Sequence, residues 1–402
     1  MNVSSLNCKI QNYAWGSRSF IASLQGRKTP SDKPEAELWI GAHSGAPAEV
    51  VEGEGKQRLD ELIAQNPKAA LGEAVAQRYG GELPFLLKVL AAAQPLSLQA
   101  HPNSAQAEAG FAADEAAAIP LSAPERSYKD RRHKPELIVA LTPFVALSGF
   151  RPVERTHRLF NELGVPALSQ LAAPLVETTP ERGLEQVFRH LMTAPAAERE
   201  ALVNATVSAA SRARTASRDF ATEFTWVERL HALYPGDIGV VSALLLNLIE
   251  LEPFEGLYLP AGNLHAYLDG AGVEIMAASD NVLRGGLTPK AVNVPELLRV
   301  LRFEVLEVVP LRPLNQTNGE QLYRTAASEF RLSYFQVRKP LRIEDRSGPE
   351  LLLVTEGRVR VQGQSSALLL EAGGTAFVPA SEGALSIEGN GLLFRARVAE
   401  PG

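Results

Sequence analysis

The chain changes character twice along its length, and this change constrains the fold more than any other feature. Residues 37–150 alternate short apolar runs with turn residues, and the same texture returns after residue 252, where dipeptides such as Asp269-Gly270 and Gly373-Gly374 recur. Such spacing is typical of short strands in a sandwich or barrel. Residues 153–234 are instead rich in Ala, Leu, Glu and Arg. The sequence therefore predicts a mainly β protein with an α-helical insert.

Helix start and stop signals support the insert. Val153–Leu163 is followed by Gly164, and glycine commonly ends a helix in a left-handed conformation. Thr179-Pro180-Glu181 supplies a capping residue, a proline at the first helical position and an acid in the first turn. The other predicted helices are residues 59–78, 105–118, a segment after Pro195, 220–234 and 238–249. The last of these is shorter than the roughly 20 apolar residues of a membrane span, so we expect a buried helix there.

The β zones contain a weak internal repeat. Residues 257–265 and 376–384 align through a shared proline, and the two copies end in His265 and Ala384. If both copies belong to barrels of one type, only the first can carry a ligand at that position. The predicted strands include residues 37–41, 83–90, 96–101, 136–141, 257–259, 273–276, 351–354 and 359–361.

Length and composition narrow the class of protein. A chain of 402 residues exceeds what one core usually organises, so two or three domains are expected. The net charge of -6 and the pI near 5.8 disfavour nucleic acid as a partner. The single cysteine, Cys8, excludes an intrachain disulfide and agrees with a reducing compartment. Residues 1–10 contain no apolar core of a secretion signal, so we expect a cytoplasmic protein without a membrane anchor.

Four side chains are candidate metal ligands with nitrogen or oxygen donors. In the predicted strand Leu96–His101, Gln99 and His101 point to the same face and can converge on one ion, although a solvent-facing polar face would look the same. His265 ends a Pro-x-Gly-x-x-His pattern that resembles the second cupin motif, and Tyr267 should point the same way. Glu136 begins an apolar strand and could be a ligand, a base or an edge residue. Together the four donors suit zinc with one open position.

A cationic segment follows the last of these candidates. Arg284 precedes Gly285-Gly286, and Lys290 follows a Thr-Pro turn. Paired glycines let the backbone approach a ligand, and the two cations could bind phosphate, although a charged surface loop is equally compatible. Lys134 also stands out, because it lies two residues before Glu136.

Six ordered blocks together resemble the type I phosphomannose isomerase family, which belongs to the cupin superfamily. The resemblance covers about residues 9–300, weakens in the helical insert and is only general in the C-terminal barrel. The blocks are residues 11–16 (QNYAWG), 83–90 (LPFLLKVL), 96–102 (LSLQAHP), 134–136 (KPE), 264–267 (LHAY) and 276–284 (MAASDNVLR).

The resemblance implies two cupin-type jelly-roll barrels and a helical domain. We expect a catalytic cupin domain from residues 1–152 and 236–305, a helical insert from 153–235, and a C-terminal barrel without metal ligands from 306–402. Two departures from the general cupin pattern affect the geometry: Phe254 stands where a glycine would normally be, and residues 103–135 must leave the barrel between His101 and Glu136.

The resemblance also implies an activity, the interconversion of mannose 6-phosphate and fructose 6-phosphate through an enediol. It assigns one zinc ion to Gln99, His101, Glu136 and His265, catalysis to Arg284, and substrate contacts to Ser97, Tyr267, Lys290, Trp15 and Asp280. For the proton carrier we favour Glu274, which alternates with Val273 and Ile275, over Lys134. We expect a monomer or a weak homodimer. The alternatives are a sugar-phosphate-binding cupin without turnover and another metal-dependent cupin enzyme such as an oxygenase.

Overall fold

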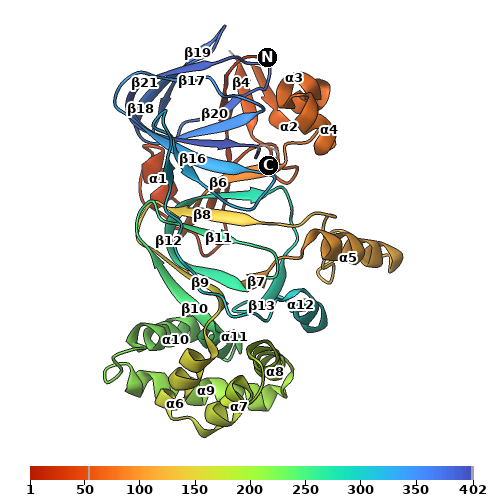
Figure 1. Ribbon diagram of the computed structural model, residues 1–402, viewed down its shortest axis with the longest axis vertical. Helices are drawn as coiled ribbons and strands as arrows, with labels where there is room; N and C mark the ends of the chain where they lie inside the picture. The colour runs from red at the N-terminus through yellow and green to blue at the C-terminus, as the bar shows by residue number, and fades with distance from the viewer. Residues whose placement is uncertain (53–54, 400–402) are drawn as a thin grey trace.

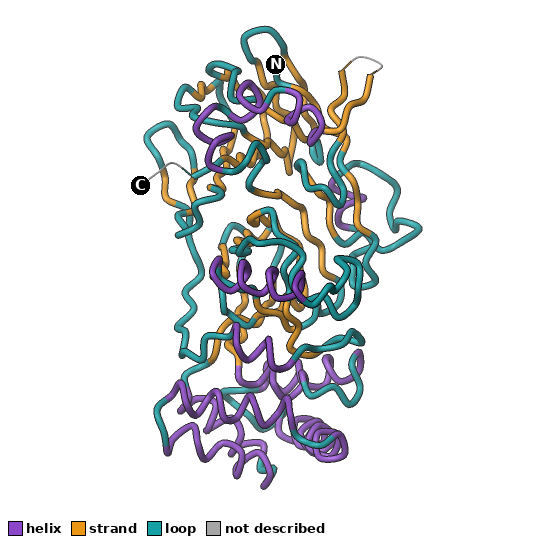
Figure 2. The backbone as a smooth tube through the Cα atoms, turned by 90° about the vertical axis from the view of Figure 1, so that its right-hand side faces the viewer, coloured by secondary structure: helices purple, strands orange, loops and turns teal. Residues whose placement is uncertain are grey.

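The computed structural model describes residues 1–52 and 55–399 of the chain. Figure 1 shows three regions stacked along the long axis: strands of both chain ends at the top, a second group of strands in the middle, and a bundle of helices at the bottom. Figure 2 shows the same separation of strands and helices from the side. The expected fold class, mainly β with a helical insert, is confirmed.

The middle region is a ten-stranded antiparallel sheet that is folded round on itself. Its longest strand, β12 (His265–Ala277), pairs in turn with β9 and β7 at its start and with β6 and β8 at its end. A bulge lies between Tyr267 and Asp269 and is followed by Gly270 with φ 116°. It bends β12 so that the strand can pair with β7 and β9 at its start and with β6 and β8 at its end. The other strands are β2 (Lys9–Gln11), β3 (Glu37–Ile40), β6 (Phe85–Ala92), β7 (Leu98–Ala100), β8 (Glu136–Ala140), β9 (Phe144–Phe150), β10 (Leu246–Leu251), β11 (Gly256–Leu259) and β13 (Leu283–Gly286).

The upper region is an eleven-stranded sheet that joins the two ends of the chain. The first strand, β1 (Ser4–Asn7), lies between β20 (Thr375–Val378) and β4 (Glu49–Glu52). The domain boundaries at residues 152, 235 and 305 stay a prediction. The upper sheet, which contains the C-terminal strands, also includes the N-terminal strands β1 and β4. The remaining strands are β5 (Gly55–Arg58), β14 (Leu314–Asn315), β15 (Gln321–Tyr323), β16 (Arg331–Val337), β17 (Leu341–Ile343), β18 (Glu350–Gln362), β19 (Ala367–Glu371) and β21 (Leu385–Arg397).

Helices form the lower region and cover parts of the two sheets. In α6 the apolar residues Leu159, Phe160 and Leu163 are buried, and Gly164 ends the helix in the left-handed conformation that its sequence predicts. The helices of the insert are α6 (Val153–Leu163), α7 (Pro166–Glu177), α8 (Pro180–Thr193), α9 (Ala196–Ala213), α10 (Ala221–Leu233) and α11 (Gly239–Ser242) with the 3-10 turn η1 (Ala243–Leu245). The others are α1 (Phe20–Leu24), α2 (Leu59–Gln65), α3 (Pro67–Leu71), α4 (Glu73–Arg78), α5 (Ser104–Ala116) and α12 (Val294–Val300).

Four local predictions are wrong. Residues 238–249 are buried but not one helix, because pairing with β9 makes β10 from residue 246 onward. The helix over 59–78 is three helices, interrupted at Asn66 and at Gly72, whose φ is 82°. Residues 351–354 and 359–361 are not two strands but parts of one, β18, with a bulge between Val354 and Glu356. Asp269-Gly270 is not a turn between strands but lies inside β12. In each case pairing or backbone conformation outweighs local propensity.

The core of the molecule is continuous between the two sheets. One cluster of buried apolar residues includes Leu87 and Val273 of the middle sheet together with Leu353 and Phe394 of the upper sheet. The two barrels therefore pack against each other through an apolar contact. Among the described helices, none combines the length and the apolar character needed to cross a membrane.

Candidate metal centre and substrate pocket

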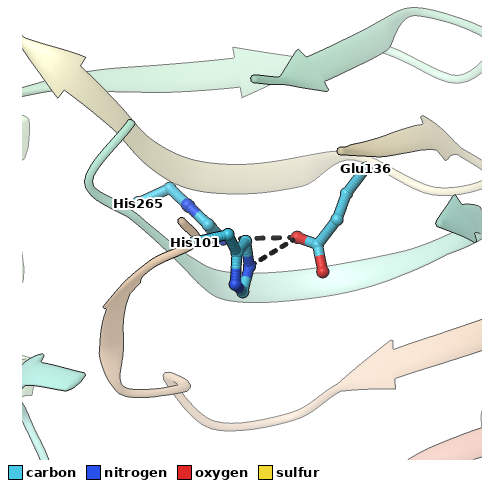
Figure 3. Close-up of side chains that lie close together, drawn as sticks. All are labelled: His101, Glu136 and His265. Atoms are coloured by element: carbon cyan, nitrogen blue, oxygen red, sulfur yellow. Dashed lines mark ion pairs between the residues drawn. The ribbon is translucent and has the colours of Figure 1, made fainter. Parts of the chain in front are cut away.

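Three side chains from separate strands converge inside the middle sheet. His101 follows β7 directly, Glu136 is the first residue of β8, and His265 is the first residue of β12. The Nε2 atoms of His101 and His265 lie 3.4 and 3.3 Å from Oε2 of Glu136, as Figure 3 shows. All three are buried. The pattern of strand ends in the sequence thus places three of the predicted ligands at one point.

Backbone carbonyls fix the orientation of both imidazole rings. Nδ1 of His101 lies 2.7 Å from the carbonyl oxygen of Asn281, and Nδ1 of His265 lies 3.0 Å from that of Asn263. Each Nδ1 therefore carries the proton and donates it, which leaves the Nε2 lone pair directed at the carboxylate of Glu136. Metal-ligating histidines commonly donate their other ring N–H to a carbonyl oxygen in this way.

The electrostatics of the cluster suit a cation. Burial lowers the pKa of His101 to about 4, so its ring is neutral and can act as a ligand. Although burial opposes ionisation, the neighbouring Lys134 ammonium holds the pKa of Glu136 well below its usual range. Nε2 of His101 and Oε2 of Glu136 are buried without a hydrogen-bond partner. Buried polar atoms without partners are rare, and here a divalent cation would satisfy both.

Gln99 lies beside this cluster. Its side-chain Nε2 is 3.3 Å from Nε2 of His265, and in the sheet it stands opposite both His265 and Arg284. Turning the amide by 180° would exchange the nitrogen for the oxygen, since the two ends are assigned only from their contacts. An oxygen there would complete a set of two imidazoles, a carboxylate and an amide. The position thus agrees with the predicted ligand role, which stays a prediction.

A buried carboxylate network adjoins the centre. Glu274 of β12 accepts a hydrogen bond of 2.9 Å from the Tyr267 hydroxyl and lies 3.1 Å from Nζ of Lys88. Lys88 also contacts Glu37 at 3.4 Å and lies over the ring of Trp39. Burial raises the pKa of Glu274, with Lys88 acting against it. A carboxylate with a raised pKa and an adjacent hydroxyl is suited to exchanging a proton.

Lys134 lies directly beside the metal cluster. Its Nζ lies 3.0 Å from Oε1 of Glu136, the oxygen that does not face the two histidines, and the side chain is nearly buried. This contact explains why the sequence places a lysine two residues before the carboxylate. Lys134 can orient Glu136, and it stays the second candidate for proton transfer.

Arg284 and Lys290 form a cationic edge next to Gln99. Arg284 is half-buried on β13 and makes no hydrogen bond or ion pair with any residue in the described part of the chain. Burial lowers the pKa of Arg284, and the charge of Arg284 in turn lowers the pKa of Lys290. Two neighbouring cations that share no carboxylate are disposed to bind an anion.

The remaining predicted substrate residues lie at different depths. Tyr267 is buried, whereas Ser97 and Trp15 are half-buried and Trp15 stacks with Tyr13. Asp280 is exposed and lies 3.4 Å from Nε2 of His43. The structure brings Tyr267 against Glu274, but it assigns Ser97 no hydrogen bond within the described residues, so the substrate roles stay predictions.

Sequence reasoning missed three residues of this region: Lys88, Glu37 and His43. Lys88 sits within β6, where every residue is buried, and a charged residue in an otherwise apolar central strand is a signal of a functional or paired group. Glu37 has a weaker signal, because it begins a predicted strand. The sequence around His43 contains no signal that distinguishes it from an ordinary histidine in a loop.

Comparisons with known proteins give a consistent result. The sequence pattern described as "Phosphomannose isomerase type I, catalytic domain" matches residues 3–153, and that of the helical insertion domain matches 166–246. "Mannose-6-phosphate isomerase" of Escherichia coli K12 is 38% identical over 398 residues, covering 96% of this chain and 97% of the relative. The chain belongs to the type I phosphomannose isomerase family. The human mannose-6-phosphate isomerase is also 38% identical, over 320 residues that cover 75% and 73% of the two chains.

Solved structures of phosphomannose isomerases have the same fold. That of the Salmonella typhimurium mannose 6-phosphate isomerase bound to fructose 6-phosphate and zinc is 36% identical, with a TM-score of 0.90 over the full length of both chains. A zinc-bound mannose 6-phosphate isomerase gives 0.91 at 35% identity, again over both full chains. These matches confirm the predicted family and extend it through the C-terminal barrel, where the sequence resemblance was only general.

One feature of this phosphomannose isomerase departs from the general cupin pattern. Phe254, which replaces the usual glycine, has φ 71°, a conformation that is strained for a large side chain. Its carbonyl accepts a 2.6 Å hydrogen bond from Tyr323, and its ring packs against Tyr334. Both tyrosines belong to the upper sheet. The turn before β11 therefore keeps the glycine-like conformation, because contacts with the other barrel hold the phenylalanine there.

Proposed function

We propose that this protein is a zinc-dependent mannose-6-phosphate isomerase that forms fructose 6-phosphate through an enediol. The observation that carries the proposal is the buried cluster of His101, Glu136 and His265, with both Nε2 atoms directed at the carboxylate. The relative with zinc and fructose 6-phosphate bound supports the cofactor and the substrate class. Gln99 would provide the fourth ligand.

The residues around the cluster supply the rest of the chemistry. When bound, zinc would polarise the substrate oxygens as a Lewis acid and so favour negative charge on them. Glu274 would carry the proton between C2 and C1, while Tyr267 and Lys88 fix its carboxylate. Arg284 would stabilise the developing charge and Lys290 would bind the phosphate group, with Ser97, Trp15 and Asp280 as further substrate contacts. Lys134 would hold Glu136 in place or act as the alternative proton carrier.

The proposal has a direct test. The purified protein is expected to contain one zinc ion per chain by elemental analysis and to convert mannose 6-phosphate to fructose 6-phosphate in a coupled assay. Chelation followed by gel filtration should abolish the conversion, and added zinc should restore it, because no other described group can replace the Lewis acid. Full activity after complete removal of the metal would refute the proposal, and bound zinc without conversion would favour a binding protein.

Glu274→Gln tests the proton carrier. The substitution keeps the shape and removes the base, so turnover should fall by about 10²- to 10⁴-fold and exchange of the C2 proton with solvent should stop, while zinc stays bound. Glu223→Gln is the matched control, since Glu223 is likewise a buried carboxylate paired with a cation, Arg151, but lies in the helical insert. Retained exchange in Glu274→Gln would move the base to Lys134.

His43→Ala tests how Asp280 is positioned. The Gly45 N–H donates to Nδ1 of His43, so Nε2 carries the proton and donates it to Asp280. This hydrogen bond is the main cause of the lowered pKa of Asp280. Without it, KM for mannose 6-phosphate should rise about tenfold, consistent with one lost charge-assisted bond, with little change in kcat. His43→Gln, which keeps a donor, should restore KM; an unchanged KM in His43→Ala would contradict the role.

We also propose a cellular location, an oligomeric state and a metabolic role for the protein. The lone Cys8 is half-buried and desolvation raises the pKa of its thiol to about 12, which agrees with a cytoplasmic protein that does not use disulfides. We propose a monomer or a weak homodimer with a sugar phosphate as its ligand. Such an enzyme would act in mannose metabolism and contribute to the biosynthesis of GDP-mannose. The catalytic domain would comprise residues 1–152 and 236–305, with the insert and the C-terminal barrel in supporting roles.

A further inference from the structure

A side chain of the C-terminal region reaches the segment that carries Lys134. Glu329 lies in the loop between β15 and β16 of the upper sheet, and its Oε1 is 2.8 Å from Nε2 of His133. The two side chains are 13% and 29% exposed, so the contact is largely shielded from solvent. Because His133 directly precedes Lys134, the C-terminal barrel contacts the chain one residue before the lysine that lies beside the metal cluster.

The backbone around Lys134 is held at two points but not between them. Upstream, the carbonyl of Arg132 accepts a 2.8 Å hydrogen bond from the side-chain amide of Asn281. Downstream, the carbonyl of Pro135 accepts one of 3.1 Å from the N–H of Ala277. The backbone groups of the two residues in between form no hydrogen bond within the described part of the chain. The position of this dipeptide therefore depends on its side chains.

The two side chains of the dipeptide contact different regions of the protein. Nζ of Lys134 lies 3.0 Å from Oε1 of Glu136 in the middle sheet, whereas the imidazole of His133 contacts Glu329. A lysine ammonium is a point charge at the end of a flexible chain, so its ion pair alone fixes the backbone poorly. The shorter and stiffer histidine gives the dipeptide its second fixed point.

The loop of Glu329 holds the carboxylate in place. Oε2 accepts a 3.1 Å hydrogen bond from the N–H of Ser328, and Oε1 accepts one of 3.1 Å from the Ser328 hydroxyl. The carbonyl of Ser328 accepts a 2.8 Å hydrogen bond from the hydroxyl of Tyr79, and Phe330 is fully buried. Although burial opposes ionisation, the hydrogen bond from His133 holds the pKa of Glu329 below its usual range. An ionised carboxylate only accepts, so Nε2 of His133 carries the proton and donates it.

We propose that Glu329 is a positioning residue of the isomerase, which fixes His133 and thereby holds Lys134 against Glu136. The inference rests on the proposed function, because it adds a residue to that active site. Glu329 acts through His133, since none of its hydrogen bonds reaches the metal cluster. The C-terminal barrel, which carries no metal ligands, then contributes a side chain on which turnover depends.

Steady-state kinetics of the zinc-loaded full chain tests the proposal. In Glu329→Ala, kcat for mannose 6-phosphate should fall about tenfold, as expected for one lost charge-assisted hydrogen bond, while KM changes by less than about twofold and zinc stays bound. Glu329→Gln keeps an acceptor without the charge and should recover part of kcat. Glu198→Ala is the matched control, because Glu198 contacts His190 at 2.9 Å in the helical insert, and its kcat should equal that of the parent.

A double-mutant cycle distinguishes positioning from a general loss of stability. In a His133→Ala background, Glu329→Ala should lower kcat by less than about twofold, because the contact is already absent. Melting temperatures should stay close to that of the parent, since a partly exposed pair contributes little to stability. Equal losses of kcat in the two backgrounds, or parental kcat in Glu329→Ala, would overturn the proposal.

A measurement without turnover separates this inference from the proposed function. NMR of nitrogen-labelled histidine, above the ordinary titration range of imidazole, should place the proton of His133 on Nε2, with its signals assigned by their absence from His133→Ala. The proton should redistribute between the ring nitrogens in Glu329→Ala but not in Glu198→Ala. A tautomer that ignores Glu329→Ala would overturn the inference. If the tautomer responds but the parent converts no mannose 6-phosphate, the proposed function fails and Glu329 is a structural residue only.

Discussion

His101→Ala is expected to remove the bound metal and to reduce turnover by about three orders of magnitude or more. The reason is that His101 provides a neutral Nε2 donor held by the Asn281 carbonyl, and alanine leaves Glu136 with one imidazole partner instead of two. Loss of Lewis-acid stabilisation is worth several kcal/mol, and each 1.4 kcal/mol corresponds to about a factor of ten in rate. Elemental analysis and the coupled assay measure both effects on the same sample.

The control for His101→Ala is His190→Ala. His190 also pairs with a glutamate, but both side chains are about half exposed on the helical insert. This variant should keep one zinc ion and the parent's turnover. Circular dichroism should show both variants folded. If His101→Ala retained stoichiometric zinc with near-parental kcat, the metal centre would have to lie elsewhere.

Arg284→Ala is expected to reduce kcat by about 10²- to 10³-fold while leaving the zinc content unchanged. Arg284 lies opposite Gln99 in the sheet, so its guanidinium is next to the metal centre without being part of it. It has no carboxylate partner among the described residues, and burial strengthens its interaction with negative charge that develops on the substrate. Removal of one such electrostatic donor typically costs this much in turnover.

Arg302→Ala provides the comparison for Arg284→Ala. Arg302 is exposed and pairs with Glu304, so its loss should change kcat by less than a factor of two. Arg284→Lys keeps the charge but not the planar group, and an intermediate rate would assign part of the effect to geometry. Turnover of Arg284→Ala within a few-fold of the parent, with zinc retained, would show that Arg284 is not catalytic.

The sequence was sufficient to predict the three residues of the metal cluster, but not the charged side chains that surround them. Each residue of the cluster lies at one end of a strand, because His101 follows β7 while Glu136 and His265 begin β8 and β12. Side chains from distant segments can meet at strand ends. The network of Lys88 with Glu37 and Glu274 depends on register: Lys88 is opposite Glu274 on one side and Trp39 on the other. A shift of register by one residue would separate them, and sequence periodicity does not fix register between strands far apart in the chain.

Secondary structure failed where tertiary contacts decide the backbone. Residues 238–249 have the apolar content of a buried helix, and only the free edge of β9 makes residues 246–251 a strand. The two halves of β18 looked like separate strands because a glycine such as Gly357, with φ 72°, is typical of a turn, whereas its pairing with β21 continues through this position. The Gly164 stop, by contrast, is a local signal, and it was predicted correctly.

The pairing of β1 with β20 has a consequence for the order of assembly. The ribosome makes Ser4–Asn7 long before Thr375–Val378, so one edge of β1 lacks its partner while the segments between them are being translated. Unpaired strand edges promote association between chains. The nascent enzyme therefore carries an open edge until β20 emerges, and shielding of that edge in the cell should limit association between unfinished chains.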